Sequence, residues 1–178
     1  MNLETAENIQ CEFEYLALDG YFPMHFASHG QGNKDWQFAV EFIYRLLICQ
    51  LATLEPINFE TKNDILDFCH NLAKQSPFNN DNEVWYQGEI VLTKKGIDLI
   101  KEYIPEAFEE WNGKKFELNI PFIKTLKNIF VNYEVAWDEK NPLFPIISFK
   151  SGVGVTAQGV REIHNKAKEL YDQTRKDR

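Results

Sequence analysis

The chain has 178 residues, of which 44% are hydrophobic and 14% aromatic, so it can bury its own core and is not an intrinsically disordered chain. Its net charge of −8 is uneven: residues 1–60 hold nine Asp/Glu against two Lys/Arg, whereas residues 121–178 hold seven against ten. This distribution disfavours nucleic acid as a partner for the first two thirds of the chain and favours a basic partner.

Targeting signals are not expected. The start, MNLETAEN, lacks the basic region and apolar run of a signal peptide, and Glu41 and Arg45 interrupt the most apolar segment, which argues against a membrane span. The three cysteines fall in no metal-ligand spacing and indicate reduced thiols. We therefore expect a cytoplasmic protein that forms one domain over residues 1–178, with residues 172–178 a frayed charged tail.

The first expected elements are a hairpin and a long helix. Residues 12–28 alternate in part between apolar and polar positions around Asp19-Gly20, which predicts two strands joined by a tight turn. Residues 36–54 contain no glycine or proline, and their polar positions form one narrow stripe, which predicts the buried central helix of the fold, capped by Asp35. The stripe consists of Gln37, Glu41 and Arg45, and the expected core residues are Trp36, Phe42, Ile43, Leu46 and Leu47.

The rest of the chain alternates amphipathic helices with short extended stretches. In chain order, the expected elements are a helix at 63–75, a strand at 84–92, a helix capped by Thr93, a short helix from Pro105 to Asn112-Gly113, a helix at 121–133, a strand at 144–149 and a last helix from Thr156. The pattern predicts an α+β fold: a single domain with a central buried helix and amphipathic helices packed on a small sheet.

A glycine-rich stretch, residues 151–159, raises the question of a phosphate-binding loop. It lacks the Lys-Ser/Thr pair of a P-loop and the third glycine of a dinucleotide fingerprint. The windows VLTKKGIDLI and GVTAQGVREI share the pattern apolar-Thr-x-x-Gly-apolar, and the first has no glycine-rich lead-in. We therefore expect threonine-capped junctions between strand and helix, and no cofactor.

Catalytic and metal-binding constellations are not evident in the sequence. His25 and His29 are four residues apart, which suits two zinc ligands on a helix, but Pro23 and the aromatic surroundings favour a strand and no third ligand has a recognised spacing. Cys69 and His70 are neighbours, so on a helix their side chains point apart. We expect a hydrogen-bonded or surface histidine pair, no metal and no enzyme activity, although the spacing leaves a metal at His25 and His29 open.

Residues 36–104 resemble winged-helix proteins. The resemblance rests on the order helix, helix, strand, and on a helix that begins with the pattern LTxxGxxLI, whose matching residues are Leu92, Thr93, Gly96, Leu99 and Ile100. It implies a winged-helix-like architecture and, as an alternative function, a transcriptional regulator. However, the expected recognition helix NDILDFCHNLAKQ holds two aspartates and one lysine, so DNA binding is not expected.

Residues 22–100 resemble the immunity proteins of bacterial contact-dependent inhibition and related polymorphic toxin systems. The resemblance rests on the apolar helix FAVEFIYRLLICQLATLEP followed by VWYQGEI, in a small, acidic, aromatic-rich chain. It implies a non-catalytic protein that binds and neutralises a cognate toxin domain, often a nuclease. Complementary charge would speed this association and set its specificity.

The surface that binds the toxin is expected at carboxylates that cluster away from lysines. One group precedes the strand at 84–92, and the other recurs at spacings of three and four around the short helix from Pro105, which places it on one face. The candidate partner-binding residues are Asp81, Glu83, Glu102, Glu106, Glu109 and Glu110.

Overall fold

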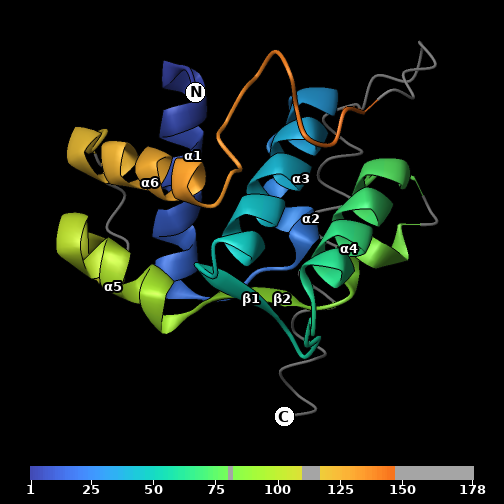
Figure 1. Ribbon diagram of the computed structural model, residues 1–178, viewed down its shortest axis with the longest axis horizontal. Coiled ribbons are helices and arrows are strands. Elements are labelled where there is room, and N and C mark those ends of the chain that lie inside the picture. Colours follow the sequence, from blue (N-terminus) through green and yellow to red (C-terminus); the bar gives the residue numbers. More distant parts are fainter. Residues whose placement is uncertain (80–81, 110–116, 147–178) are drawn as a thin grey trace.

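The computed structural model describes residues 1–79, 82–109 and 117–146 (Figure 1). The elements are α1 (Leu3–Leu18), α2 (Pro23–Phe26), α3 (Asn33–Ile48), β1 (Ala52–Glu55), α4 (Lys62–Lys74), η1 (Glu83–Tyr86), β2 (Glu89–Leu92), α5 (Lys94–Tyr103), η2 (Pro105–Phe108) and α6 (Ile120–Asn132), where η marks a 3-10 helix. This architecture confirms the predicted α+β class. Within the described ranges, no helix combines the length and apolar character that a membrane crossing requires.

Helix α3 is the buried centre of the fold, as predicted. It lies between α1 and α4 in Figure 1, and all five side chains expected in its core are buried. The helix ends at Ile48, before the predicted end at residue 54, because Gln50 adopts a left-handed conformation with φ 57. The amide of Leu51 then donates to Leu46 O (2.9 Å), which closes a Schellman-type cap and releases the chain into β1.

The N-terminal region is helical, so the predicted hairpin over residues 12–28 is wrong. Asn2 caps α1 by accepting a hydrogen bond from the amide of Thr5 (2.8 Å), and Ile9, Phe13 and Leu16 recur on one buried face. This 3.6-residue period begins before residue 12, so a window from 12 to 28 hides it. The extended structure that the described chain has in this region is one isolated β-bridge, between Tyr21 and Ile90.

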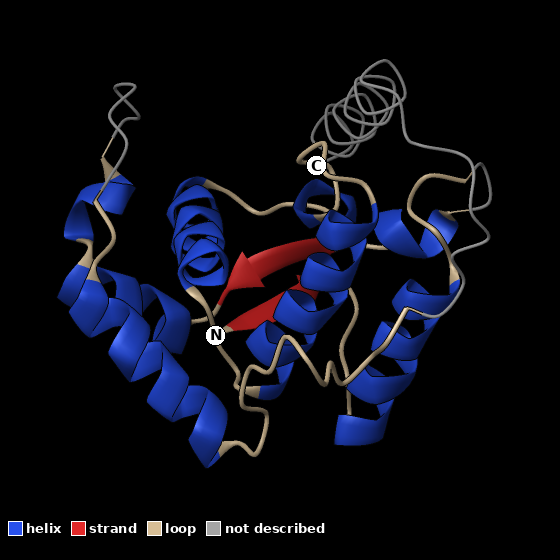
Figure 2. Ribbon diagram, turned by 90° about the horizontal axis from the view of Figure 1, so that it is seen from above, coloured by secondary structure: helices blue, strands red, loops and turns tan. Residues whose placement is uncertain are grey.

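The small sheet consists of β1 and β2, which pair antiparallel with Ala52 opposite Leu92. Figure 2 shows the two strands in the middle of the molecule with helices on either side of them. Strand β2 is shorter than predicted, because residues 83–86 form η1. Helix α4 joins the two strands and confirms the helix predicted at 63–75.

The predicted threonine cap at Thr93 is confirmed. The amide of Gly96 donates to Thr93 Oγ1 (3.2 Å), and the Thr93 hydroxyl donates to Gln50 O (2.7 Å). The glycine of this motif has a packing role, because a Cβ on Gly96 would lie 2.1 Å from Leu51 O. The motif therefore seats the start of α5 against the turn that follows α3; its second copy, at 154–163, lies outside the described residues.

Residues 133–146, here called the C-terminal segment, run from α6 across α3 (Figure 1, orange). Phe144–Ile146 does not form the strand predicted at 144–149, whose remaining residues lie outside the described ranges. The side chains of Gln37 and Glu41 take the place of a strand partner: Ile146 N donates to Gln37 Oε1 (3.0 Å) and Phe144 N to Glu41 Oε1 (2.8 Å). The polar stripe of α3 thus binds the backbone of this segment.

The remaining predictions concern η2, α6 and the end of the chain. Pro105 begins η2 and α6 lies where a helix was predicted, with Asn119 as its cap. Helix η2 ends at Phe108 because Glu109 is extended, so the prediction of one helix as far as Asn112-Gly113 is wrong at Glu109. Residues 110–116, the predicted helix from Thr156 and the predicted tail at 172–178 lie outside the described residues.

Candidate functional site

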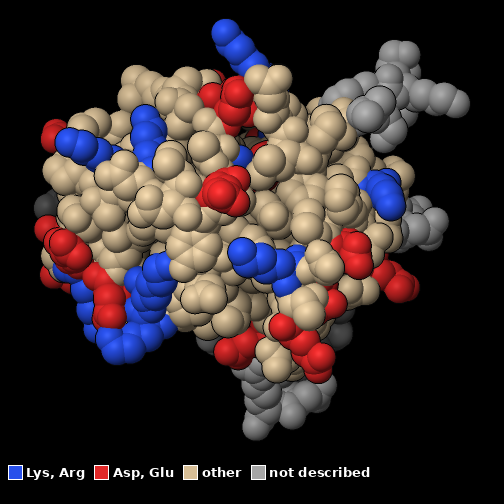
Figure 3. Space-filling view, in the orientation of Figure 1, with Lys and Arg blue, Asp and Glu red and all other residues tan. Residues whose placement is uncertain are grey.

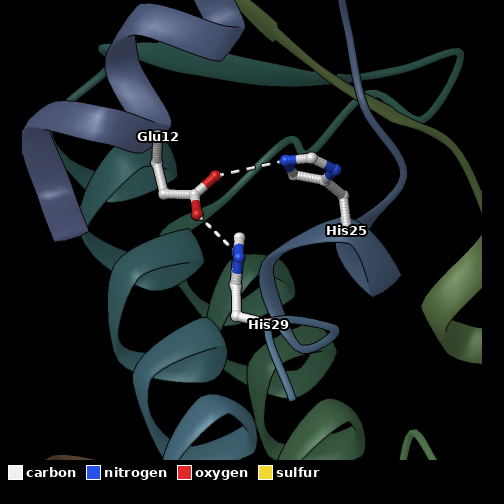
Figure 4. Close-up of side chains that lie close together, drawn as sticks. All are labelled: Glu12, His25 and His29. Carbon is white, nitrogen blue, oxygen red and sulfur yellow. Dashed lines mark ion pairs between the residues drawn. The ribbon is translucent and has the colours of Figure 1, made fainter. Parts of the chain in front are cut away.

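Three titratable side chains from different elements meet on one side of α3. Glu12 comes from the buried face of α1, His25 from α2, and His29 from the loop that follows α2 (Figure 4). Glu12 Oε1 lies 2.6 Å from His29 Nε2, and Glu12 Oε2 lies 3.4 Å from His25 Nε2. The carboxylate therefore lies between the two imidazoles.

The loop that carries His29 is held by Asp35. Gly30 and Gly32 have φ values of 91° and 64°, a region that glycine adopts without strain. The turn brings the amide of Gln31 to Asp35 Oδ2 (2.7 Å). The prediction that Asp35 caps α3 is therefore wrong. Gly32 is the N-cap, and Asp35 in the first turn binds the preceding loop instead.

Aromatic rings hold His25 in place. Its ring stacks on Tyr21 with centroids 4.2 Å apart, and the Tyr15 ring meets its edge at 5.4 Å. Tyr21 is itself fixed by its bridge to Ile90 of β2. The orientation of His25 is thus determined by α1, α2 and the sheet together.

The three side chains differ in their access to solvent. The Glu12 side chain is 3% exposed, that of His25 18% and that of His29 36%. Two buried atoms that face each other, Glu12 Oε2 and His25 Nε2, have no hydrogen-bond partner. Unpaired buried polar atoms are uncommon in folded proteins, so this pair requires an explanation.

The electrostatics of the cluster favour a charged pair between Glu12 and His29. Burial acts to raise the pKa of Glu12, but the contacts with His25 and His29 outweigh it and the pKa is lowered. The hydrogen bond to Glu12 raises the pKa of His29, against the opposing effect of burial. Burial also raises the pKa of Asp35, beside this pair.

This pair predicts a stability that depends on pH. Because the pKa of His29 lies above its ordinary value of 6.5, the contribution of His29 is fully present below about pH 6.5 and is lost as the pH rises through the raised pKa. We expect the stability advantage of the wild type over His29→Gln to shrink between pH 6 and pH 9. Urea unfolding of both proteins, in buffers that contain a metal chelator, would measure this difference in stability at each pH. A difference that stays constant from pH 6 to pH 9 would contradict the expectation.

The histidine spacing was noticed in the sequence, but Glu12 was not. His25 and His29 lie on a short helix and the loop after it, rather than on the strand that Pro23 suggested. The third member comes from α1, whose buried face includes Glu12 beside Ile9, Phe13 and Leu16. The sequence did contain a signal for Glu12, namely a carboxylate within an apolar helical stripe. It was missed because residues 12–28 were interpreted as a hairpin.

The predicted partner-binding carboxylates lie in two separate places. Glu83 is exposed on η1, which contacts α2 and α4, whereas Glu102, Glu106 and Glu109 are exposed on or beside α5 and η2, and η2 contacts α1 and α5. Asp81 and Glu110 lie outside the described residues.

The corner formed by α5 and η2 carries both signs of charge. Figure 3 shows acidic and basic side chains side by side at α5, in the lower left of the view. Lys101 Nζ lies 5.6 Å from the centroid of the Phe108 ring. Among the described residues, Glu102, Glu106 and Glu109 form no ion pair.

Comparison of the chain with protein-family models, with curated proteins and with solved structures gives no match. A functional assignment therefore depends on the residues and their geometry.

Proposed function

We propose that this protein is a non-catalytic, cytoplasmic immunity protein that binds and neutralises a cognate bacterial toxin domain. The carboxylates that would bind it are Glu102, Glu106 and Glu109, which are called the acidic corner below, although exposed lysines of α5 such as Lys101 lie in the same region. The observation that carries the proposal is the exposure of these three carboxylates without an ion-pair partner among the described residues. Exposed carboxylates attract a basic protein. A nuclease toxin is expected to be basic on its active face, because that face must bind nucleic acid.

The acidic corner is suited to rapid recognition. Complementary charges across an interface increase the association rate and disfavour partners of the wrong sign. The underlying elements also give the corner a stable base, because Leu99, Ile100 and Ala107 are buried beneath it. Substitution of the exposed carboxylates should therefore change binding rather than folding.

A DNA-binding regulator is the alternative, and α4 would be its recognition helix. Exposed Asp64 and Asp67 lie between Lys62 and Lys74, and Asp64 is engaged in a capping box with Thr61. A duplex contact requires several cations that neutralise phosphates, which this helix does not supply. No observation in the described structure favours this function.

The proposal is tested with the double variant Glu106→Lys/Glu109→Lys. The proposal predicts that a large secreted protein is encoded beside the gene for this chain, and the probe is the C-terminal domain of that protein. The measurement is the association rate of this domain at several salt concentrations. We expect slower association and a weaker salt dependence, because the charge reversal removes long-range attraction. Each exposed substitution should cost no more than about 0.5 kcal/mol of stability.

The matched control is Glu60→Lys/Asp67→Lys, which makes the same change in net charge at exposed positions before and on α4. A larger effect at the acidic corner than at the control supports the proposed interface. Equal effects would show that only total charge matters, and would contradict it. Binding of the wild type to duplex DNA at physiological salt would favour the regulator instead.

A further inference from the structure

We propose that Glu12, His25 and His29 form a binding site for a divalent first-row transition metal ion, with zinc as the best fit. The site would supply two imidazole nitrogens and one carboxylate oxygen, and would leave a further coordination position open. This inference does not rest on the acidic corner, so either proposal can fail without the other.

The donor atoms have the chemistry and spacing of a metal site. One ligand atom from each of the three residues can be chosen so that all lie within 4.8 Å of one another. In a tetrahedral zinc site with ligand distances of about 2.1 Å, neighbouring ligand atoms are separated by about 3.4 Å. The distance between Glu12 Oε2 and His25 Nε2 is 3.4 Å, so a zinc ion can bridge these two atoms without moving them apart.

His29 must move slightly to join them. Its Nε2 lies 2.6 Å from Glu12 Oε1, which is the distance of a hydrogen bond rather than of two ligands on one ion. The movement is feasible because His29 lies on a loop directly before Gly30 and Gly32, which both have positive φ, and its side chain is 36% exposed. Glu12, which is buried, and His25, which is half-buried, need not move.

The unpaired atoms provide an independent reason for a cation. Glu12 Oε2 and His25 Nε2 face each other, buried and without hydrogen bonds. When His25 is neutral and carries its proton on Nδ1, its Nε2 lone pair and the carboxylate oxygen are two opposed acceptors, which is unfavourable in a buried place. A metal ion between the two atoms would accept both lone pairs and remove this conflict.

The surroundings suit a bound cation. Ligand imidazoles in metal sites are usually oriented by neighbouring groups, and here Tyr21 stacks on His25 while Asp35 holds the loop of His29. One carboxylate and two neutral imidazoles would leave one positive charge, which Asp35 nearby partly offsets. The exposed side of His29 is where water can reach the open position.

The test uses the untagged full-length chain after removal of metal with a chelator and desalting. Zinc is titrated against a competing indicator dye, for the wild type and for Glu12→Gln, His25→Gln and His29→Gln. We expect one equivalent of zinc to bind the wild type, and each variant to bind at least about tenfold more weakly, because loss of even an outer-shell partner costs 10–100-fold. Zinc should also raise the melting temperature of the wild type.

The control is His70→Gln, which removes an exposed histidine of α4 outside the cluster and should bind zinc as the wild type does. Near-ultraviolet circular dichroism shows which variants fold, and the partly exposed His29→Gln keeps the test decisive if a buried variant does not. Absence of saturable binding at one equivalent, equal binding by His29→Gln, or loss of binding in His70→Gln would each overturn the proposal.

Discussion

Replacement of Arg45 by methionine is expected to destabilise the protein by about 3–5 kcal/mol, the usual cost of breaking a buried ion pair from one side. The Arg45 side chain is 1% exposed, and its Nη1 lies 2.7 Å from Glu41 Oε2. Its Nε and Nη2 donate to Val135 O (2.8 Å) and Ala136 O (2.9 Å) of the C-terminal segment. The variant would leave the Glu41 charge buried and two carbonyl groups unpaired.

The double variant Glu41→Gln/Arg45→Met provides the control for this result. Glutamine keeps an acceptor for the amide of Phe144 but removes the unpaired charge, so the double variant should be more stable than Arg45→Met alone. Urea unfolding of the three proteins measures both effects. A loss below about 1 kcal/mol in the single variant would show that Arg45 does not hold the C-terminal segment on α3.

Truncation of Leu46 to alanine is expected to cost about 2–5 kcal/mol, because it removes buried apolar surface and leaves a cavity at the centre of α3. Leu46 is 0% exposed, in the middle of the most buried helix. Leu143→Ala, at a position that is 43% exposed, is the matched control and should change stability little. Chemical denaturation would contradict the account if the two variants lost equal stability.

Helices α3, α4, α5 and α6 could be predicted because the apolar period of each lies within one window of sequence, although the cap predicted for α3 was wrong. Thr93 illustrates this: it was identified as a cap from its position before an amphipathic run, and it accepts the amide of Gly96. The ends were less predictable. Helix α3 stops where Gln50 takes a left-handed conformation, which is uncommon for a residue other than glycine.

The N-terminal region shows how tertiary contacts override a local pattern. Tyr21 and His25 are aromatic and follow the Asp19-Gly20 pair, a pattern that resembles a hairpin, but they pack on each other and on α1 instead. The polar stripe of α3 was identified correctly, whereas its role was not predictable. Gln37, Glu41 and Arg45 are polar because they bind the backbone of a segment about 100 residues away in sequence.

The candidate metal site could likewise be predicted only in part from the sequence. The spacing of His25 and His29 is visible in the sequence, but the third donor, Glu12, comes from another helix and is brought in by packing. Residues that are distant in sequence cannot be joined into one site without the fold. The carboxylates of the acidic corner, in contrast, come from one stretch of sequence, α5 and η2, so they could be grouped from their spacing alone; their role in binding stays a prediction.

The central claim is that this chain neutralises a toxin domain through its acidic corner, and survival of toxin-producing cells tests it most directly. Cells that express the neighbouring secreted protein's C-terminal domain should survive when the wild-type chain is co-expressed. Survival should fall with Glu106→Lys/Glu109→Lys at equal protein levels, but not with Glu60→Lys/Asp67→Lys. Death of cells that contain the folded wild-type chain, or full protection by the Glu106→Lys/Glu109→Lys variant, would contradict the claim.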